Sequence, residues 1–189
     1  MALLIFGVVF WSAAHLFPSL MPATRSRLIA QFGTGPYRGL FALDIVIAIV
    51  LMVFGWKAAP IESLYLPPLL GSPIVPSLLL LSFILFAAAN APGNIKRFLR
   101  HPMLTGMVVW AGAHLLANGE TRSLILFGGL GAWALVAMFT INRRDGAWER
   151  PAAVPFSRDL MTIVASAVLF AIVVYFHEAV IGVSPLPAM

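Results

Sequence analysis

Six apolar segments follow one another along the chain, and each is about as long as a helix that crosses a membrane. They are Ala2 to about Phe17, Gly39 to Trp56, Pro73 to Ala91, about Met103 to Ala117, Ser123 to Ile141, and Leu160 to Phe176. A spanning helix needs roughly 17–25 apolar residues, so the first and fourth segments are short. The alternation of a transmembrane strand is missing. The sequence therefore predicts an all-α, polytopic membrane protein, a bundle of about six transmembrane helices.

The composition agrees with lipid as the surroundings of this chain. Of its 189 residues, 61% are hydrophobic and 10% are charged, whereas soluble domains average about 25% charged residues. We expect a single transmembrane domain over residues 1–189, because this length leaves no room for a second, soluble domain. Cysteine is absent, which excludes disulfides, thiolate metal sites and a cysteine nucleophile. Any bound metal must use histidine, methionine or oxygen ligands.

The positive charges are concentrated in alternate loops. Ten of the 12 Lys and Arg residues fall in the first, third and fifth loops: Arg25, Arg27, Arg38, Lys96, Arg97, Arg100, Arg143, Arg144, Arg150 and Arg158. Positive loops mark the cytoplasmic side, so six spans would leave both termini periplasmic. No basic stripe interleaved with aromatic residues is present, which argues against a nucleic-acid partner. The net charge of +5 is therefore interpreted as a topology signal, with the lipid bilayer as the main partner.

Prolines predict where helices and tails begin and end. Pro18 and Pro22 are expected to end the first helix, because proline lacks the backbone N–H that a helix interior uses. The final residues, 184–189, include two prolines and predict a short extended tail.

Two histidines lie inside predicted spans, where an ionisable group is costly and usually functional. His15 follows Trp11-Ser12-Ala13-Ala14, and His114 follows Trp110-Ala111-Gly112-Ala113. Small neighbours leave room beside each imidazole, and two opposed imidazoles can hold a haem iron in a helix bundle. The alternative is that each histidine hydrogen-bonds a group on a neighbouring helix. Both interpretations stay open from the residues alone.

The expected depths of the two histidines differ. His15 lies about five residues, or roughly 8 Å, from the cytoplasmic end of its helix. His114 lies about eleven residues, or roughly 16 Å, from the cytoplasmic end of its own helix. Helix tilt or a tilted haem plane would have to absorb the difference if both bind one iron.

Other cationic residues are candidates for contact with an anionic group. Arg100 and His101 precede Pro102 at the expected start of a helix, where a phosphate or a haem propionate can bind; the alternative is a helix start anchored at the headgroups. Arg143 and Arg144 form a loop cluster that could neutralise propionates. His177 at the end of the last span is an alternative axial ligand, although interfacial anchoring also accounts for it.

The stretch around the second histidine resembles a known family. The sequence from residue 100 to residue 119 is similar to the NnrU family of bacterial membrane proteins. This stretch begins Arg100-His101-Pro102-Met103-Leu104-Thr105-Gly106 and continues through Trp110-Ala111-Gly112-Ala113-His114-Leu115 to Gly119. Supporting matches are the opening helix with His15, the segment Gly35 to Phe41, and the ending Tyr175-Phe176-His177. The resemblance covers essentially the whole chain and implies a location in the bacterial inner membrane.

The resemblance also carries expectations about chemistry. The family is named for its association with nitrite and nitric oxide reduction, and it is similar to the plant 15-cis-zeta-carotene isomerase, a membrane haem b enzyme. The two haem-ligating histidines of that enzyme fall on His15 and His114 here. Ala111 stands where the isomerase has a cysteine, and a further histidine important in the isomerase falls near Trp56.

Three functions follow as hypotheses. The first is a haem b-binding membrane protein with iron ligated by His15 and His114, and with a redox or accessory role in nitrite and nitric oxide metabolism. The second is a haem-dependent cis–trans isomerase of a polyene such as a carotene. The third is a non-enzymatic membrane assembly factor without a cofactor. The ligands or partners that these imply are an apolar polyene, a small nitrogen-oxide ligand, or a component of the respiratory chain.

Overall fold

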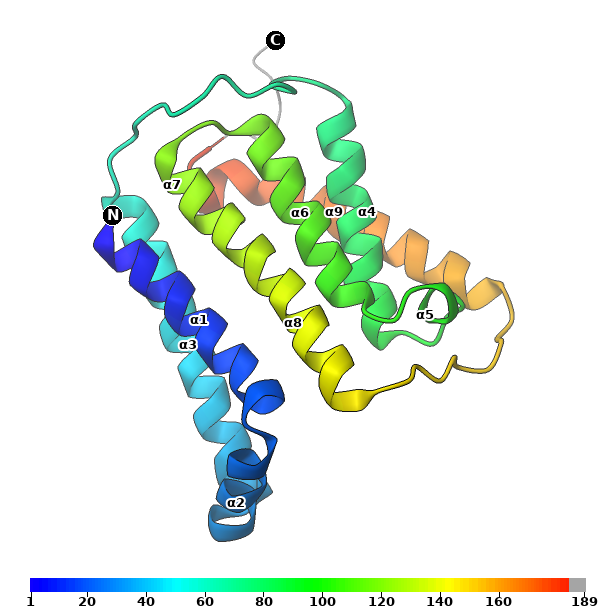
Figure 1. Ribbon diagram of the computed structural model, residues 1–189. Coiled ribbons are helices and arrows are strands. Elements are labelled where there is room, and N and C mark those ends of the chain that lie inside the picture. The colour runs from blue at the N-terminus through cyan, green and yellow to red at the C-terminus, as the bar shows by residue number, and fades with distance from the viewer. Residues whose placement is uncertain (184–189) are drawn as a thin grey trace. The chain divides into compact units, whose positions relative to one another are not determined.

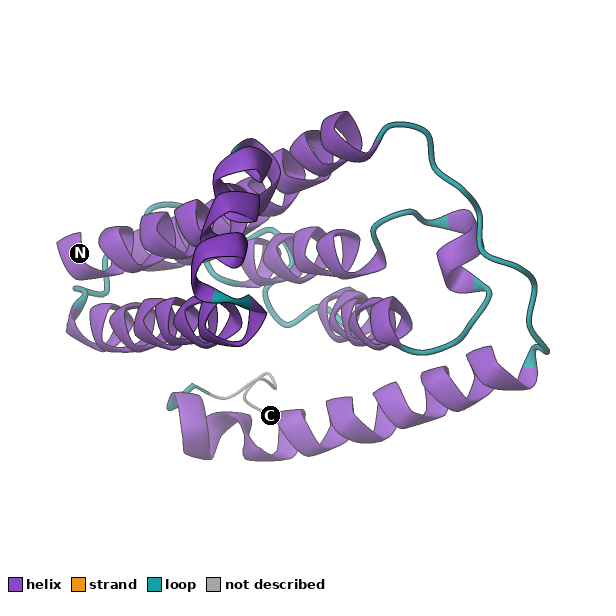
Figure 2. Cartoon of the chain, turned by 90° about the horizontal axis from the view of Figure 1, so that it is seen from below, coloured by secondary structure: helices purple, strands orange, loops and turns teal. Residues whose placement is uncertain are grey.

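Helices account for nearly all of the regular structure. The computed structural model describes residues 1–183, and in this range a single isolated bridge, Ser63 to Glu120, is the only β pairing; Figures 1 and 2 show the helices and their loops. The helices are α1 (Ala2–Leu20), α2 (Pro22–Phe32), α3 (Thr34–Ala58), α4 (Ile74–Asn90), α5 (Ile95–Phe98), α6 (Pro102–Ala117), α7 (Thr121–Ser123), the π-helix η1 (Leu124–Gly128), α8 (Gly129–Asp145) and α9 (Ser157–Ile181). The all-α prediction is confirmed. The tail expected at 184–189 lies outside the described residues.

Five of the six apolar segments each lie within one continuous helical stretch, and the third, Pro73 to Ala91, extends one residue beyond each end of α4. Four helices are long and apolar enough to cross a membrane: α1, α3, the stretch Thr121–Asp145 formed by α7, η1 and α8, and α9. α4 and α6 are apolar but shorter, with 17 and 16 residues. The chain is therefore a polytopic membrane protein, with four full-length spans and two shorter apolar helices.

The prediction for the end of the first helix was wrong. α1 continues through Pro18 to Leu20, and Pro22 begins α2 instead of merely ending α1. Proline at the first helical position loses no hydrogen bond, which explains Pro22. Near Pro18 the Ser19 hydroxyl donates to the Leu16 carbonyl at 2.9 Å. Prolines are more frequent in membrane helices than in soluble ones, which agrees with an internal proline in α1.

The chain forms two compact units. The first comprises residues 1–65 and 119–146, and the second comprises residues 66–118 and the chain from 147 onward. The first unit therefore contains α1, α2, α3, and the long helix ending in α8. The second contains α4, α5, α6 and α9.

Glycines let α1 approach its neighbours closely in the first unit. α1 packs along α3 and also contacts α8. A Cβ added at Gly55 would lie 2.5 Å from the backbone nitrogen of Leu4, and one at Gly129 would lie 2.5 Å from Val8 Cγ1. Leu4 itself is fully buried. Close backbone approach at small residues is how helices associate in lipid, where burial of apolar surface from water does not drive them together.

In the second unit, α4 packs against both α6 and α9. Gly106 of α6 lies against Phe86 and Leu85 of α4, and Phe83 meets Phe170 of α9 edge to face at 5.5 Å between ring centroids. α4 therefore meets α6 at a small residue and meets α9 through a pair of aromatic side chains.

A polar cluster joins the loop after α4 to the start of α9. The Asn94 amide nitrogen Nδ2 donates to Asp159 Oδ2 at 2.6 Å and to the Val154 carbonyl at 2.8 Å. The Asn94 backbone N–H donates to Asp159 Oδ1 at 2.7 Å, and the Val154 N–H donates to Asn94 Oδ1 at 3.1 Å. Asp159 is buried. One asparagine side chain therefore satisfies both a buried carboxylate and a loop backbone.

We expect Asn94→Ala to lower the free energy of unfolding by about 1–3 kcal/mol, because it leaves buried polar groups without partners. The matched control is Asn90→Ala, four residues earlier. Asn90 is exposed, and within residues 1–183 its side chain has no hydrogen bond. Thermal unfolding in detergent measures both variants. Equal losses for the two would show that the cluster does not stabilise the second unit.

Candidate functional site

His15 is held by its own helix. Its Nδ1 lies 3.0 Å from the carbonyl oxygen of Trp11, one turn earlier. A carbonyl only accepts, so Nδ1 carries the proton, and in the neutral imidazole Nε2 then carries the lone pair. Within residues 1–183 Nε2 has no hydrogen-bond partner. In this part of the chain His15 therefore lacks the interhelical hydrogen bond that the alternative interpretation predicts.

Aromatic rings surround this imidazole. Ring centroids lie 4.1 Å away for Trp11, 4.9 Å for Trp133 of α8, and 5.6 Å for Phe41 of α3. The indole N–H groups of Trp11 and Trp133 are both buried and have no hydrogen-bond partner among the described residues. Buried donors without acceptors are rare in proteins, and a bound water, ion or ligand can satisfy them. The surroundings of His15 thus contain two unused donors beside a ring nitrogen with an open lone pair.

His114 repeats the local construction of His15 in the second unit. Its Nδ1 lies 2.9 Å from the Trp110 carbonyl, again one turn earlier, and the Trp110 ring lies 4.6 Å from the imidazole. Ala111 and Ala113 beside it are buried. The same reasoning places the proton on Nδ1 and the lone pair of the neutral imidazole on Nε2. A Trp-x-x-x-His turn therefore occurs twice in the chain, with the same hydrogen bond each time.

Both imidazoles make a hydrogen bond of a kind that is common among metal-binding histidines. A histidine that binds a metal typically donates its other ring N–H to a carbonyl or carboxylate, which fixes the tautomer and the ring orientation. Here the acceptor is the preceding turn of the same helix. No group of three or more His, Cys, Asp or Glu residues that could hold a metal ion occurs within residues 1–183.

The other predicted contacts fall in both units. His101 caps α6, and Arg100 precedes it, so these two lie in the second unit with His114. His177 of α9 donates from Nδ1 to the Val183 carbonyl at 2.8 Å. Arg143 and Arg144 end α8, in the first unit with His15. Roles in cofactor binding for these residues stay predictions.

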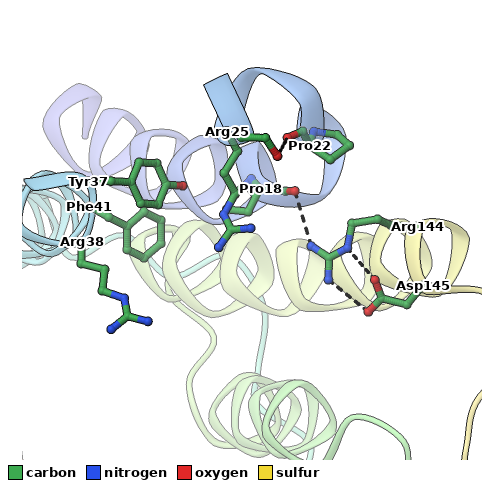
Figure 3. Close-up of a pocket in the computed structure, with 9 residues that line it drawn as sticks. Pro18, Pro22, Arg25, Tyr37, Arg38, Phe41, Arg144 and Asp145 are labelled. Atoms are coloured by element: carbon green, nitrogen blue, oxygen red, sulfur yellow. Dashed lines mark hydrogen bonds and ion pairs between the residues drawn. The ribbon is translucent and has the colours of Figure 1, made fainter. Parts of the chain in front are cut away.

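A pocket of about 670 Å³ lies in the first unit, where α1 ends, α2 and α3 begin and α8 ends. Its lining residues are Pro18, Pro22, Arg25, Ser26, Tyr37, Arg38, Phe41, Arg144 and Asp145. Figure 3 shows the Tyr37 and Phe41 rings projecting from α3, and the dashed lines from Arg144. Phe41 also contacts His15, so one ring joins the pocket to the histidine.

Arg144 is already engaged within this pocket. Its Nε donates to Asp145 Oδ1 at 2.6 Å and its Nη2 to Asp145 Oδ2 at 3.1 Å. Its Nη1 lies 3.4 Å from the Pro18 carbonyl, which links the end of α8 to that of α1. The charge of Arg144 is therefore largely balanced by its neighbour.

One of the comparisons with known proteins identifies a family. The family model described as NnrU protein matches residues 3–185, which is nearly the whole chain. The chain belongs to the NnrU family. No curated protein and no solved structure gives a significant match. For this NnrU family member the chemistry therefore has to be argued from its own residues.

Sequence reasoning found both histidines but missed their aromatic partners. The signal was present, because a tryptophan precedes each histidine by four residues, which is one helical turn. No comparable sequence spacing identifies the other residues around His15 and the pocket, which are Trp133, Phe41, Arg25 and Tyr37. They come from separate segments and meet only through the packing of the first unit.

Proposed function

We propose that this NnrU protein is a haem b-binding membrane protein in which His15 and His114 are the axial ligands of the iron. The observation that carries the proposal is the repeated turn in which tryptophan's carbonyl holds the Nδ1 proton of each histidine. That hydrogen bond leaves Nε2 as the ligating atom in both cases. The porphyrin supplies the other ligands, so two histidines suffice.

The residues present fit such a group chemically. Small buried side chains, Ala111 and Ala113, flank His114, and the unused indole donors of Trp11 and Trp133 lie beside His15. A planar, mostly apolar ring system with carboxylate substituents matches both features. The predicted contacts of the propionates with Arg100, His101, Arg143 and Arg144 are part of this proposal.

The role proposed for the haem is redox or accessory work in nitrite and nitric oxide metabolism. When bound, haem b supplies one-electron chemistry. The chain's own residues would hold the imidazole tautomers through the tryptophan carbonyls, and Trp11, Trp133 and Phe41 would surround the haem-binding side chain of His15. Such a role implies an electron-transfer partner. The partner that we propose is a respiratory-chain component in the bacterial inner membrane.

Titration of the haem-free protein with haem tests the proposal. Wild-type protein in detergent should saturate at about one haem per chain, because the two ligands serve one iron. The double variant His15→Ala/His114→Ala should show no saturable binding. Saturable binding that is the same in wild type and double variant would overturn the assignment of both ligands.

The alternative without a cofactor predicts interhelical hydrogen bonds at the histidines. At His15 this bond is not formed within residues 1–183, since Nδ1 is bonded within α1. The isomerase alternative needs a cleft for a long polyene that reaches the ligating histidines, and it is kept as a hypothesis to be tested on haem-loaded protein.

A further inference from the structure

The pocket at the ends of α1 and α8 carries more positive than negative charge. Three arginines and one aspartate line it. Arg144 is paired with Asp145, but within residues 1–183 neither Arg25 nor Arg38 has a carboxylate partner. The Arg25 guanidinium carbon lies 5.7 Å from the centre of the Tyr37 ring, which orients the group without neutralising it.

One residue that lines the pocket, Tyr37, carries an unused hydroxyl. The Tyr37 Oη atom is buried and has no hydrogen-bond partner among the described residues. In Figure 3 the Tyr37 ring projects from α3 toward Arg25, and the Arg38 side chain lies on the other side of the Phe41 ring. Leaving a buried hydroxyl unpaired costs free energy, and the cost is recovered when an acceptor arrives. Two unpaired guanidinium groups and one hydroxyl donor therefore suit an anion with several oxygen atoms.

The helix beside the pocket has the composition of a segment that lies at a membrane surface. α2 has no buried residue, and its eleven residues include Arg25, Arg27, Leu28, Ile29 and Phe32. Short helices that combine basic and bulky apolar residues lie in the headgroup region. The spans α1 and α8 end at this pocket. We therefore expect the pocket to lie at the depth where lipid phosphates occur.

We propose that this pocket binds a phosphate group, carried either by an anionic phospholipid or by a soluble phosphate, through Arg25, Arg38 and Tyr37. One guanidinium group can donate two parallel, charge-assisted hydrogen bonds to the oxygen atoms of a phosphate. The volume of about 670 Å³ lies within the roughly 300–1,000 Å³ of ordinary ligand pockets. Asp145 neutralises one of the three arginines, and a phosphate would balance the positive charge of the other two. The site does not depend on haem binding.

Native mass spectrometry tests this site on full-length protein, haem-free and haem-loaded, in neutral detergent with equal amounts of phosphatidylglycerol and phosphatidylcholine. We expect retained phosphatidylglycerol, and a loss of affinity of about ten-fold or more in Arg25→Gln/Arg38→Gln. The control Arg27→Gln/Arg150→Gln removes the same charge outside the pocket and should bind like wild type. Tyr37→Phe should weaken binding without lowering thermal stability, since within residues 1–183 the hydroxyl has no partner.

Each outcome bears on the proposal. If millimolar inorganic phosphate displaces the lipid from wild type, the site accepts soluble phosphate; if it does not, the lipid is the ligand, and both results support a phosphate site. Equal losses in the two double variants would show general charge attraction and overturn it. Displacement of the lipid by haem loading would assign the arginines to propionates and also overturn it.

Discussion

Replacing either proposed axial ligand is expected to change the coordination of the haem iron, and not merely to weaken haem binding. With His15→Ala or His114→Ala, haem-loaded protein should lose the low-spin spectrum of a six-coordinate iron and become high-spin or lose its haem. The reason is that each histidine presents Nε2 from a fixed turn, with Nδ1 held by tryptophan's carbonyl, and no cysteine exists in the chain to replace it. The visible spectrum measures this directly.

The control for these variants is His177→Ala. Its Nδ1 is bonded to the Val183 carbonyl, and under the proposal its loss leaves the spectrum unchanged. Added imidazole should restore the low-spin spectrum to His15→Ala, which a merely misfolded variant would not show. If His177→Ala loses the low-spin spectrum while His15→Ala keeps it, His177 and not His15 is the axial ligand.

Gly55→Ala is expected to destabilise the first unit by about 1–3 kcal/mol, through overpacking between α1 and α3. The added Cβ would lie 2.5 Å from the Leu4 backbone nitrogen and 2.6 Å from its Cα. Backbone atoms cannot turn aside as a flexible side chain does, so α1 must shift. Thermal unfolding in detergent, followed by circular dichroism, measures the loss.

The same helix contains a matched control. Apart from its chain neighbours and the nearby backbone of α3 itself, a Cβ added at Gly39 would meet no atom of residues 1–183 within 4 Å, so Gly39→Ala should be neutral or stabilise α3 by about 0.5–1 kcal/mol. If the two substitutions change the free energy of unfolding in opposite directions, packing and not helix propensity determines the effect. Destabilisation of similar size at both positions would contradict the close approach of α1 and α3.

The helices were largely predictable because lipid imposes one simple requirement on their sequences. An apolar run of spanning length must satisfy its own backbone, so each of the six runs became a helix. The ends were less predictable. α1 passes Pro18, and α2 has a sequence too polar for the pattern that revealed the spans. Its helix forms because Pro22 begins it and Gly33, with φ of 88°, allows the turn that ends it.

The candidate site was predictable only in part. A histidine at membrane depth is conspicuous in the sequence, so His15 and His114 were found. The rings of Trp133 and Phe41 lie against His15 only because α3 and α8 pack on α1, and sequence spacing does not reveal such contacts. Arg25 and Arg38 were assigned to topology alone, since loop arginines usually mark the cytoplasmic side. Their common pocket with Tyr37 required the fold.

The measurement that tests the central proposal most directly is the visible spectrum of purified wild-type protein, oxidised and then reduced, before and after haem addition. Ligation by His15 and His114 predicts a Soret band and, on reduction, the sharp bands of low-spin haem b. A spectrum that stays featureless after haem addition would contradict the proposal and return both histidines to a structural role.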